Sequence, residues 1–330
     1  MKIIFSVFVT LLLALVAFAG VEFLQLHFVF GVVIPYFAFL FFVFGFILRV
    51  IGWAKAPTPF NITTTAGQQK SLSWIKNENL ENPRNSAGVF GRMFLEVFFF
   101  RSLFRNTTAY LNKRQNLGYG SEKTLWLGGL LFHWSFFFIF IRHLRFFTNP
   151  PLSFVGSMES IDGFMQVGVP VFYFTDLILL LTVTFLFLRR VYLPRIKYIS
   201  LTADYFPLLL IFAIGVSGVA MRYIIRVDIM SIKTMTMSLV HFSPVVPAGI
   251  QSIVFVHLFL VCALFIYFPM SKLMHMAGVF LSPTRNLQGN SRENRHVNPW
   301  NYPVKVHPYD HYEDEFREPM KKAGIPVDKE

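Results

Sequence analysis

Six long runs of apolar, almost uncharged residues constrain this chain more than any other feature. A helix needs roughly 20 such residues to cross the hydrocarbon core of a bilayer. The qualifying segments are residues 3–19, 28–48, 125–146, 167–188, 204–224 and 251–273. Only 15% of the residues are charged, which excludes a cytoplasmic enzyme, a disordered tail and a disulfide-stapled secreted domain. The sequence predicts an all-α integral membrane protein with about six transmembrane helices.

The first run follows Met1-Lys2 and ends just before Gly20, as a secretory signal peptide does. The second run starts almost at once, because only Glu22 and His27 interrupt the apolar residues between them. We therefore expect the first helix to be retained and to form a tight hairpin with the second, within residues 1–52.

Lys and Arg residues are distributed unevenly between the two sides of the expected bundle. With the N-terminus inside, the loops and tail on that side hold 23 of them and the other side holds five. Basic loops stay in the cytoplasm when a membrane protein inserts. This predicts a multi-pass protein of the cell membrane with both termini cytoplasmic. The formal net charge of +12 then reflects these loops rather than binding of nucleic acid.

Four of the nine histidines lie in or at the ends of expected spans, where an ionisable side chain indicates function. His257 and His275 are eighteen positions apart, which is five helical turns and about 27 Å, so they face one direction at opposite membrane surfaces. His133 and His143 are ten positions apart. Ten residues cover about 15 Å and turn by roughly 280°, so these two diverge on an ideal helix.

The third and last spans run antiparallel in this topology, which groups the histidines in two pairs. His133 is level with His275 near the cytoplasm, and His143 is level with His257 near the outer surface. Two imidazoles are suitable axial ligands for one haem iron. The spacing predicts a dihaem cytochrome b bundle with two non-covalent haem b groups. Helix tilt and a kink at Pro269 are expected to absorb the mismatch in length.

Other metal sites fit the sequence less well. The single cysteine, Cys262, excludes a Cys-ligated zinc or iron–sulfur site and covalent haem attachment. Zinc at the histidine pairs is disfavoured, because no carboxylate accompanies either pair. The remaining histidines are expected at ordinary surface or interface positions: His27, His241, His296, His307 and His311.

Several stretches resemble a known family. They are PFNITTTAGQQKSLSWIK (59–76), FRSLFRNT (100–107), FHWSFFFIFIRHLRFF (132–147), DGFMQVGVP (162–170), YISLTADYFPL (198–208), KLMHMAGVFLSPTRN (272–286) and RHVNPWN (295–301). These stretches resemble DsrM and HmeC, the cytochrome-b membrane subunits of the sulfite-reduction-associated, heterodisulfide-reductase-like (Hdr-like) menaquinol oxidoreductase complex. The histidine spacing resembles, more distantly, that of the nitrate reductase gamma subunit family.

The resemblance implies a redox function in dissimilatory sulfur metabolism. A subunit of this kind oxidises menaquinol and passes electrons across the membrane to a cytoplasmic iron–sulfur Hdr-like subunit of the DsrK or HmeD type. The terminal reduction then belongs to that partner. Further membrane and periplasmic subunits are also implied, with the His133 and His275 haem nearer the cytoplasmic partner.

A quinol-oxidising site needs a polar group beside a haem that accepts a proton. The outer end offers Asp162 or Glu159 as the acceptor, and Arg142 or Arg145 as the partner of a haem propionate. The alternative for these residues is solvation by lipid headgroups. Asp176, inside the fourth span, is expected either to relay protons or to bond neighbouring helices.

The loops complete the expected domain organisation. Residues 53–124 form a cytoplasmic loop with an interfacial helix near 89–111, residues 125–275 a four-helix haem-binding domain, and residues 276–330 a partner-docking tail. Two other functions stay open at this point. One is a proton-coupled transporter, and the other is a membrane anchor without redox function.

Overall fold

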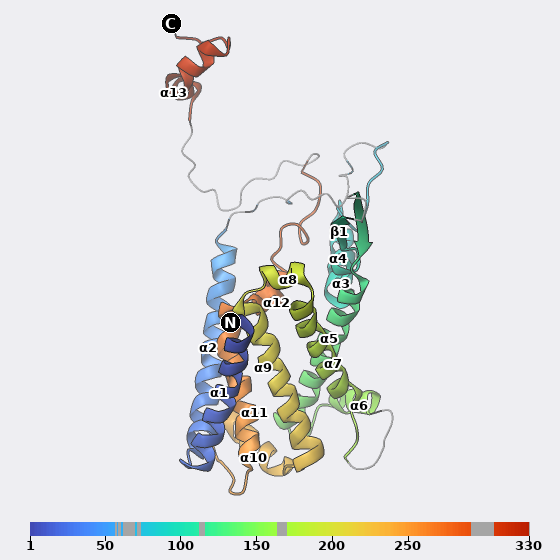
Figure 1. Ribbon diagram of the computed structural model, residues 1–330, viewed down its shortest axis with the longest axis vertical. Helices are drawn as coiled ribbons and strands as arrows, with labels where there is room; N and C mark the ends of the chain where they lie inside the picture. The colour runs from blue at the N-terminus through green and yellow to red at the C-terminus, as the bar shows by residue number, and fades with distance from the viewer. Residues whose placement is uncertain are drawn as a thin grey trace.

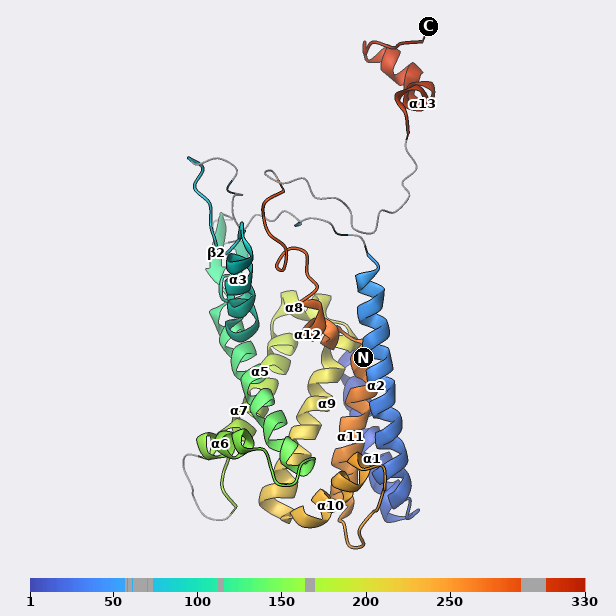
Figure 2. The same ribbon diagram turned by 180° about the vertical axis from the view of Figure 1, so that it is seen from behind.

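The chain folds as a bundle of long helices, seen from two sides in Figures 1 and 2. The computed structural model describes residues 1–56, 58, 61, 70, 74–111, 116–163, 170–291 and 307–329. Within these ranges, five helical segments are long and apolar enough to cross a membrane: Lys2–Glu22, Val29–Ala54, Lys123–Phe146, Thr202–Ile225 and Ser252–Met270. The expected helical membrane fold is confirmed.

Each of these segments consists of one α-helix, and four of them include a turn of another helix type. The α-helices are α1 (Lys2–Glu22), α2 (Ile34–Ala54), α5 (Lys123–His143), α9 (Thr202–Val219) and α11 (Ser252–Tyr267). The added turns are Val29–Val33, Leu144–Phe146, Ala220–Ile225 and Phe268–Met270. Shorter helices in the connections are α6 (Ser153–Asp162), α8 (Pro194–Ile199), α10 (Ile229–Val240) and α12 (His275–Gly278).

The fourth expected span, 167–188, corresponds to α7 (Phe174–Tyr192). This helix packs against α5 and α9 but carries charges at both ends, which separates it from the five apolar segments. It begins later than expected because Asp162 caps its first turn. The Asp162 carboxylate accepts hydrogen bonds from the Thr175 backbone N–H at 2.9 Å and the Thr175 hydroxyl at 2.6 Å.

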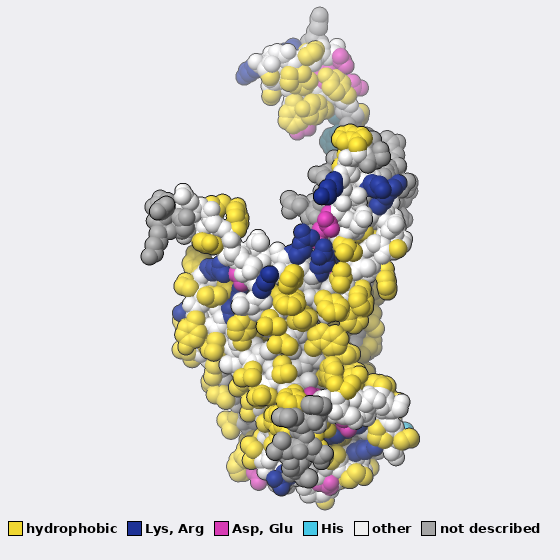
Figure 3. Space-filling model, turned by 90° about the vertical axis from the view of Figure 1, so that its right-hand side faces the viewer, with side chains coloured by type: hydrophobic (Ala, Val, Ile, Leu, Met, Phe, Trp, Pro, Cys, Tyr) yellow, Lys and Arg dark blue, Asp and Glu magenta, His cyan; other side chains and the backbone are white. Residues whose placement is uncertain are grey.

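The bundle is held by contacts between helices that are distant in sequence. α5 packs on α7, α7 on α9, and α9 on both α1 and α11, while α2 packs on α11. The buried centre is apolar and includes Ala17, Val183, Leu210, Phe255 and Leu260. Large apolar side chains also cover the outside, where Figure 3 shows them as a broad band between charged ends. Such a surface is suited to lipid rather than water.

α1 forms part of this core. Ala17 and Val21 are fully buried, and Lys2 Nζ donates a hydrogen bond to the Ser200 carbonyl at 2.7 Å. The expected pairing with the second helix takes a different form, because α11 packs against both α1 and α2. These contacts tie the first helix to the rest of the bundle, and its retention stays a prediction.

α3 (Ser86–Phe99) and α4 (Arg101–Phe104) contact the first half of α5, and an antiparallel hairpin of β1 (Thr107–Leu111) and β2 (Leu117–Ser121) extends beyond its start (Figures 1 and 2). We call this end of the molecule the basic end, because Arg189 and Arg190 in the last turn of α7 and Arg195 of α8 lie beside it. The interfacial helix expected near 89–111 is shorter than predicted. It ends at Phe99, and the next residue, Phe100, has a left-handed backbone (φ 51°) that redirects the chain. The hairpin was not predicted from the sequence.

The tail contains a helix that the sequence analysis did not anticipate, α13 (Tyr309–Lys322). Its Glu313 is fully buried and accepts hydrogen bonds from the backbone N–H groups of Asp328 at 2.9 Å and Lys329 at 2.7 Å. These bonds fold the segment after the helix back onto it. Docking of the tail on a partner stays a prediction.

Close packing of α5 on α7 supplies a test of the fold. A Cβ atom added at Gly128 would lie 2.5 Å from Phe185 Cε1, whereas one added at Gly156 of α6 would meet nothing within 4 Å. We expect Gly128→Ala to lower the free energy of unfolding by about 1–3 kcal/mol, because the Phe185 ring must move. Gly156→Ala, the matched control, should leave it unchanged or slightly raised. Thermal unfolding in detergent measures both, and equal stability of the two variants would contradict this α5–α7 contact.

Candidate functional site

The structure brings the four span histidines together in two pairs. The ring centres of His133 and His275 are 5.9 Å apart with planes at 84°, and those of His143 and His257 are 6.4 Å apart with planes at 13°. α5 supplies one member of each pair, and α11 and α12 supply the others. The first pair lies at the basic end and the second toward the opposite end.

Both separations match two imidazoles bound to one metal ion. An imidazole nitrogen binds a metal at about 2 Å, and the ring centre lies roughly 1 Å behind that nitrogen. Two rings on opposite sides of one ion therefore have centres about 6 Å apart. Within the described residues no three His, Cys, Asp or Glu side chains converge on a metal-sized site. A metal held by two imidazoles alone needs further donors from a cofactor, and a porphyrin supplies four.

The second nitrogen of each imidazole is already in use. Nδ1 faces a backbone carbonyl in three of the histidines: Gly129 O at 2.7 Å for His133, Ile139 O at 2.7 Å for His143 and Lys272 O at 2.8 Å for His275. A carbonyl oxygen only accepts, so each Nδ1 carries the proton and Nε2 keeps a free lone pair. Metal-binding histidines are oriented in the same way.

His257 reaches the same state through a serine. Its Nδ1 lies 2.9 Å from Ser217 Oγ, and that hydroxyl donates its own proton to the Ile214 carbonyl at 2.9 Å. Ser217 Oγ therefore accepts a hydrogen bond from His257, which leaves Nε2 unprotonated. Gly218 lies beside this ring, because a Cβ atom there would be in van der Waals contact with His257 Cε1 at 3.4 Å.

A break after α11 reconciles the unequal spacings of ten and eighteen residues. α11 ends at Tyr267, Pro269 lies in a 3-10 turn, and a second 3-10 turn at Lys272–Met274 precedes His275. His257 and His275 therefore lie on separate helices, which removes the requirement that they share one ideal helix face. Pro269 is where the sequence analysis expected a kink.

The second pair lies beside a buried ionic cluster, which we call the outer cluster: Arg142, Asp162, Thr175, Asp176 and Tyr223. Arg142 is 7% exposed and forms ion pairs with both Asp176 and Asp162. Its Nε lies 3.3 Å from Asp162 Oδ2. The Tyr223 hydroxyl donates to Asp176 at 2.8 Å. The cluster links α5, α6, α7 and the turn after α9.

Two arginines also stack on one tyrosine at this end. The guanidinium carbon Cζ of Arg142 lies 3.8 Å from the ring centre of Tyr173, and that of Arg222 lies 4.2 Å from the same ring centre. Arg222 further donates to the Val171 carbonyl at 3.0 Å. The sequence pattern does not predict a role for Tyr173, Ser217, Arg222 or Tyr223. Their only signal was polar character next to the ends of apolar runs.

Arg145 and Glu159 form a separate pair at 2.8 Å, and both side chains are about a quarter exposed. Arg145 Nε is buried and makes no hydrogen bond within the described part of the chain. Of the expected site residues, Asp162 and Arg142 are thus committed to the outer cluster, whereas Glu159 and Arg145 stay accessible. His296 lies outside the described residues. His27 packs against Phe255, and His241 directly follows α10.

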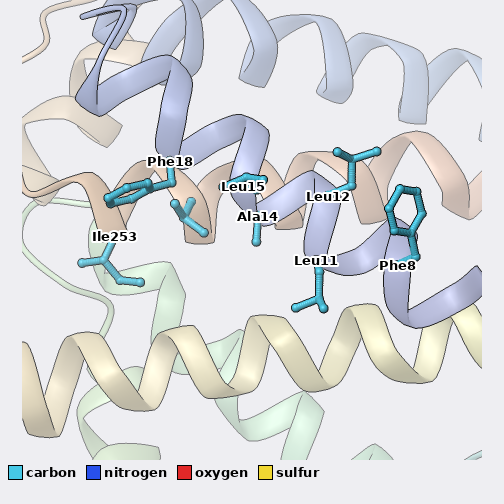
Figure 4. Close-up of a pocket in the computed structure, with 8 residues that line it drawn as sticks. Phe8, Leu11, Leu12, Ala14, Leu15, Phe18 and Ile253 are labelled. Atoms are coloured by element: carbon cyan, nitrogen blue, oxygen red, sulfur yellow. The ribbon is translucent and has the colours of Figure 1, made fainter. Parts of the chain in front are cut away.

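An apolar groove of about 530 Å³ runs along α1 and the start of α11 (Figure 4). Its lining is Phe8, Leu11, Leu12, Ala14, Leu15, Phe18, Ile253 and Val256. These side chains offer no hydrogen-bonding group for the polar ring of a quinol. The groove therefore suits acyl chains or a neighbouring helix.

Comparison with known proteins agrees with this architecture. The sequence pattern of the nitrate reductase gamma subunit family matches residues 90–288, which contain all four paired histidines. The chain is 43% identical over 279 residues to the Hdr-like menaquinol oxidoreductase cytochrome b-like subunit of Archaeoglobus fulgidus, covering 82% of this chain and 83% of that one. The chain belongs to the family of Hdr-like menaquinol oxidoreductase cytochrome b-like subunits. The corresponding subunit of Archaeoglobus profundus is 40% identical over 275 residues, covering 81% of each chain.

Charged side chains buried in the bundle of this cytochrome b-like subunit need partners of opposite charge. Arg142→Gln leaves Asp162 and Asp176 without their counter-ion, so we expect a loss of about 3–5 kcal/mol in the free energy of unfolding. Arg145→Gln, the matched control, breaks a partly exposed pair and should cost about 0–1 kcal/mol. Thermal unfolding of the purified variants measures both. Equal losses would show that the outer cluster does not stabilise the bundle.

Proposed function

We propose that this chain is the membrane cytochrome b subunit of a menaquinol oxidoreductase, holding two haem b groups and passing electrons across the membrane. The observation that carries the proposal is the two imidazole pairs, one at the middle of α5 and one at its C-terminal end, in which each Nδ1 donates a hydrogen bond and each Nε2 stays free. The names of the relatives support menaquinol as the electron donor.

The residues fit two haems. His133 and His275 would hold the haem at the basic end, and His143 and His257 the haem toward the opposite end. Each haem would supply one-electron redox chemistry, while the protein supplies ligands and surroundings. The rings of Phe100 and Phe132 lie 4.8 and 4.9 Å from His133 and present apolar edges beside the first pair.

Charge supports the direction in which the bundle is inserted. The basic end carries Arg189, Arg190 and Arg195 and joins the loop and tail, in which most of the Lys and Arg occur. Such an end faces the cytoplasm. Electrons would then leave the His133 and His275 haem toward a cytoplasmic iron–sulfur Hdr-like subunit, of the DsrK or HmeD type, where the terminal step of sulfur metabolism would take place.

Menaquinol oxidation releases two electrons and two protons, so the quinol site needs a proton acceptor near the outer haem. Asp162 has both oxygens engaged by Arg142 and Thr175, which makes it a structural group. Glu159 keeps one oxygen outside its pair with Arg145 and is partly exposed. We assign proton acceptance to Glu159, and to Arg145 Nε the contact with a haem propionate.

The haem assignment predicts a definite stoichiometry. The purified chain should carry about two haem b groups, and His143→Leu or His257→Leu should each reduce this to about one, because one iron loses an axial ligand. His241→Leu, a histidine outside the pairs, should retain the native content. Pyridine haemochrome spectra give the count. A native chain that takes up haem neither alone nor with its partners would overturn the proposal and favour a non-redox anchor or a transporter.

The proton acceptor has its own test. Glu159→Gln should slow the reduction of haem by a menaquinol analogue by about 100-fold or more, because the amide cannot accept the quinol proton. Glu22→Gln, which changes a carboxylate at the same end of the bundle, should leave the rate unaltered. Stopped-flow absorbance at the haem bands measures the rate. Unchanged reduction in Glu159→Gln with two haems bound would exclude this residue as the acceptor.

A further inference from the structure

The hairpin at the basic end exposes one complete face. In the antiparallel register Ala109 lies opposite Tyr119, and Leu111 opposite Leu117. Side chains alternate along a strand, so these four share one face, which we call the open face. Leu111, Leu117 and Tyr119 are 69%, 59% and 67% exposed. The other face is partly covered, because the Tyr110 ring lies over Gly118 and Gly120.

An isolated two-stranded hairpin is marginally stable in water, and an exposed apolar face on it promotes aggregation unless another protein surface covers it. Yet this hairpin is firmly attached at its base. The Glu122 backbone N–H donates to the Asn106 carbonyl at 3.2 Å, and the Glu122 carboxylate accepts from Thr108, Arg189 and Arg195. The hydrogen bond from Thr108, followed by those two guanidinium groups, lowers the pKa of Glu122 and keeps it ionised. The open face is therefore held ready for a partner.

The charges around the hairpin indicate the chemistry of that partner. Two carboxylates, Glu81 and Glu122, lie among four arginines: Arg101, Arg105, Arg189 and Arg195. The surroundings thus carry more positive than negative charge, and the Arg105 and Arg195 side chains are about half exposed. A complementary surface presents an apolar patch bordered by carboxylates. A second copy of this chain is disfavoured because its own net charge is +12.

The hairpin also leads directly to the first histidine pair. β2 ends at Ser121, α5 begins at Lys123, and His133 follows ten residues later, about 15 Å along the helix. The segment before the hairpin adds a second connection, because the Phe100 ring packs on His133 and Phe104 packs on Trp126 of α5. A protein seated on the hairpin would lie close to the His133 and His275 pair. Both ribbon views place the hairpin beyond α8 (Figures 1 and 2).

We propose that the open face of this hairpin is the docking surface for the electron-accepting protein at the basic end, a soluble protein with an apolar patch bordered by carboxylates. The inference rests on the proposed function for the identity of the acceptor. It adds the surface that the acceptor binds and the chemistry that recognises it. Arg105 and Arg195 steer the encounter, and Leu117 and Tyr119 provide the buried contact.

The test separates docking from redox function. The probe is the soluble iron–sulfur fraction that high salt releases from native membranes, added back to the haem-loaded chain in vesicles. Leu117→Ser with Tyr119→Ser should weaken rebinding of this fraction by about tenfold or more, because the apolar contact is lost. Phe242→Ser, at the opposite end and 83% exposed, is the matched control and should rebind normally. Rebinding to the native chain should also weaken as salt increases.

Two results would overturn the docking surface. One is native rebinding by the double variant. The other is quenching of a Tyr119→Trp fluorophore by brominated lipid in vesicles, which would place the open face in the bilayer. Failure of the proposed function looks different: the menaquinol analogue would not reduce the native chain, whatever the rebinding. Loss of rebinding in the double variant, with haem reduction still at the native rate, supports both.

Discussion

The low dielectric of the bilayer is the constraint on which this structure depends. A polar group in the hydrocarbon region must find its partner within the protein, because water is absent. The four histidines meet this requirement with Nδ1 and leave Nε2 free of these hydrogen bonds. Arg142 meets it with two carboxylates and a tyrosine ring. The same requirement that stabilises the bundle therefore also orients its candidate ligands.

The two ends of the bundle have different characters, and each suits a different part of electron transfer. At one end the outer cluster buries charge, and the Arg145–Glu159 pair stays accessible beside the second histidine pair. At the basic end the β1–β2 hairpin extends beyond the start of α5. The enclosed polar end is compatible with the proposed quinol site, and the projecting hairpin with the proposed docking of a protein acceptor. α5 connects the two, because it carries one histidine of each pair.

Much of the site could be predicted from particular residues. The depths of His133, His143, His257 and His275 followed from helical rise and an antiparallel arrangement, and the structure places them in those pairs. The break at Pro269 was also expected. The start of α7 was not, because it depends on Asp162 capping a helix across an intervening segment. The hairpin was missed because its strands are short and contain two glycines, so they carry little strand propensity.

The sequence by itself determined the membrane fold, the approximate spans and the residues available as ligands, because these depend on local apolar length and periodicity. The tertiary structure decided which polar groups are committed and which stay available. Asp162 and Glu159 are equivalent candidates in the sequence, yet one caps α7 and binds Arg142 while the other remains accessible. That difference depends on contacts between α5, α6 and α7. Contacts between elements distant in sequence produce no local periodic pattern, so they cannot be predicted from such a pattern.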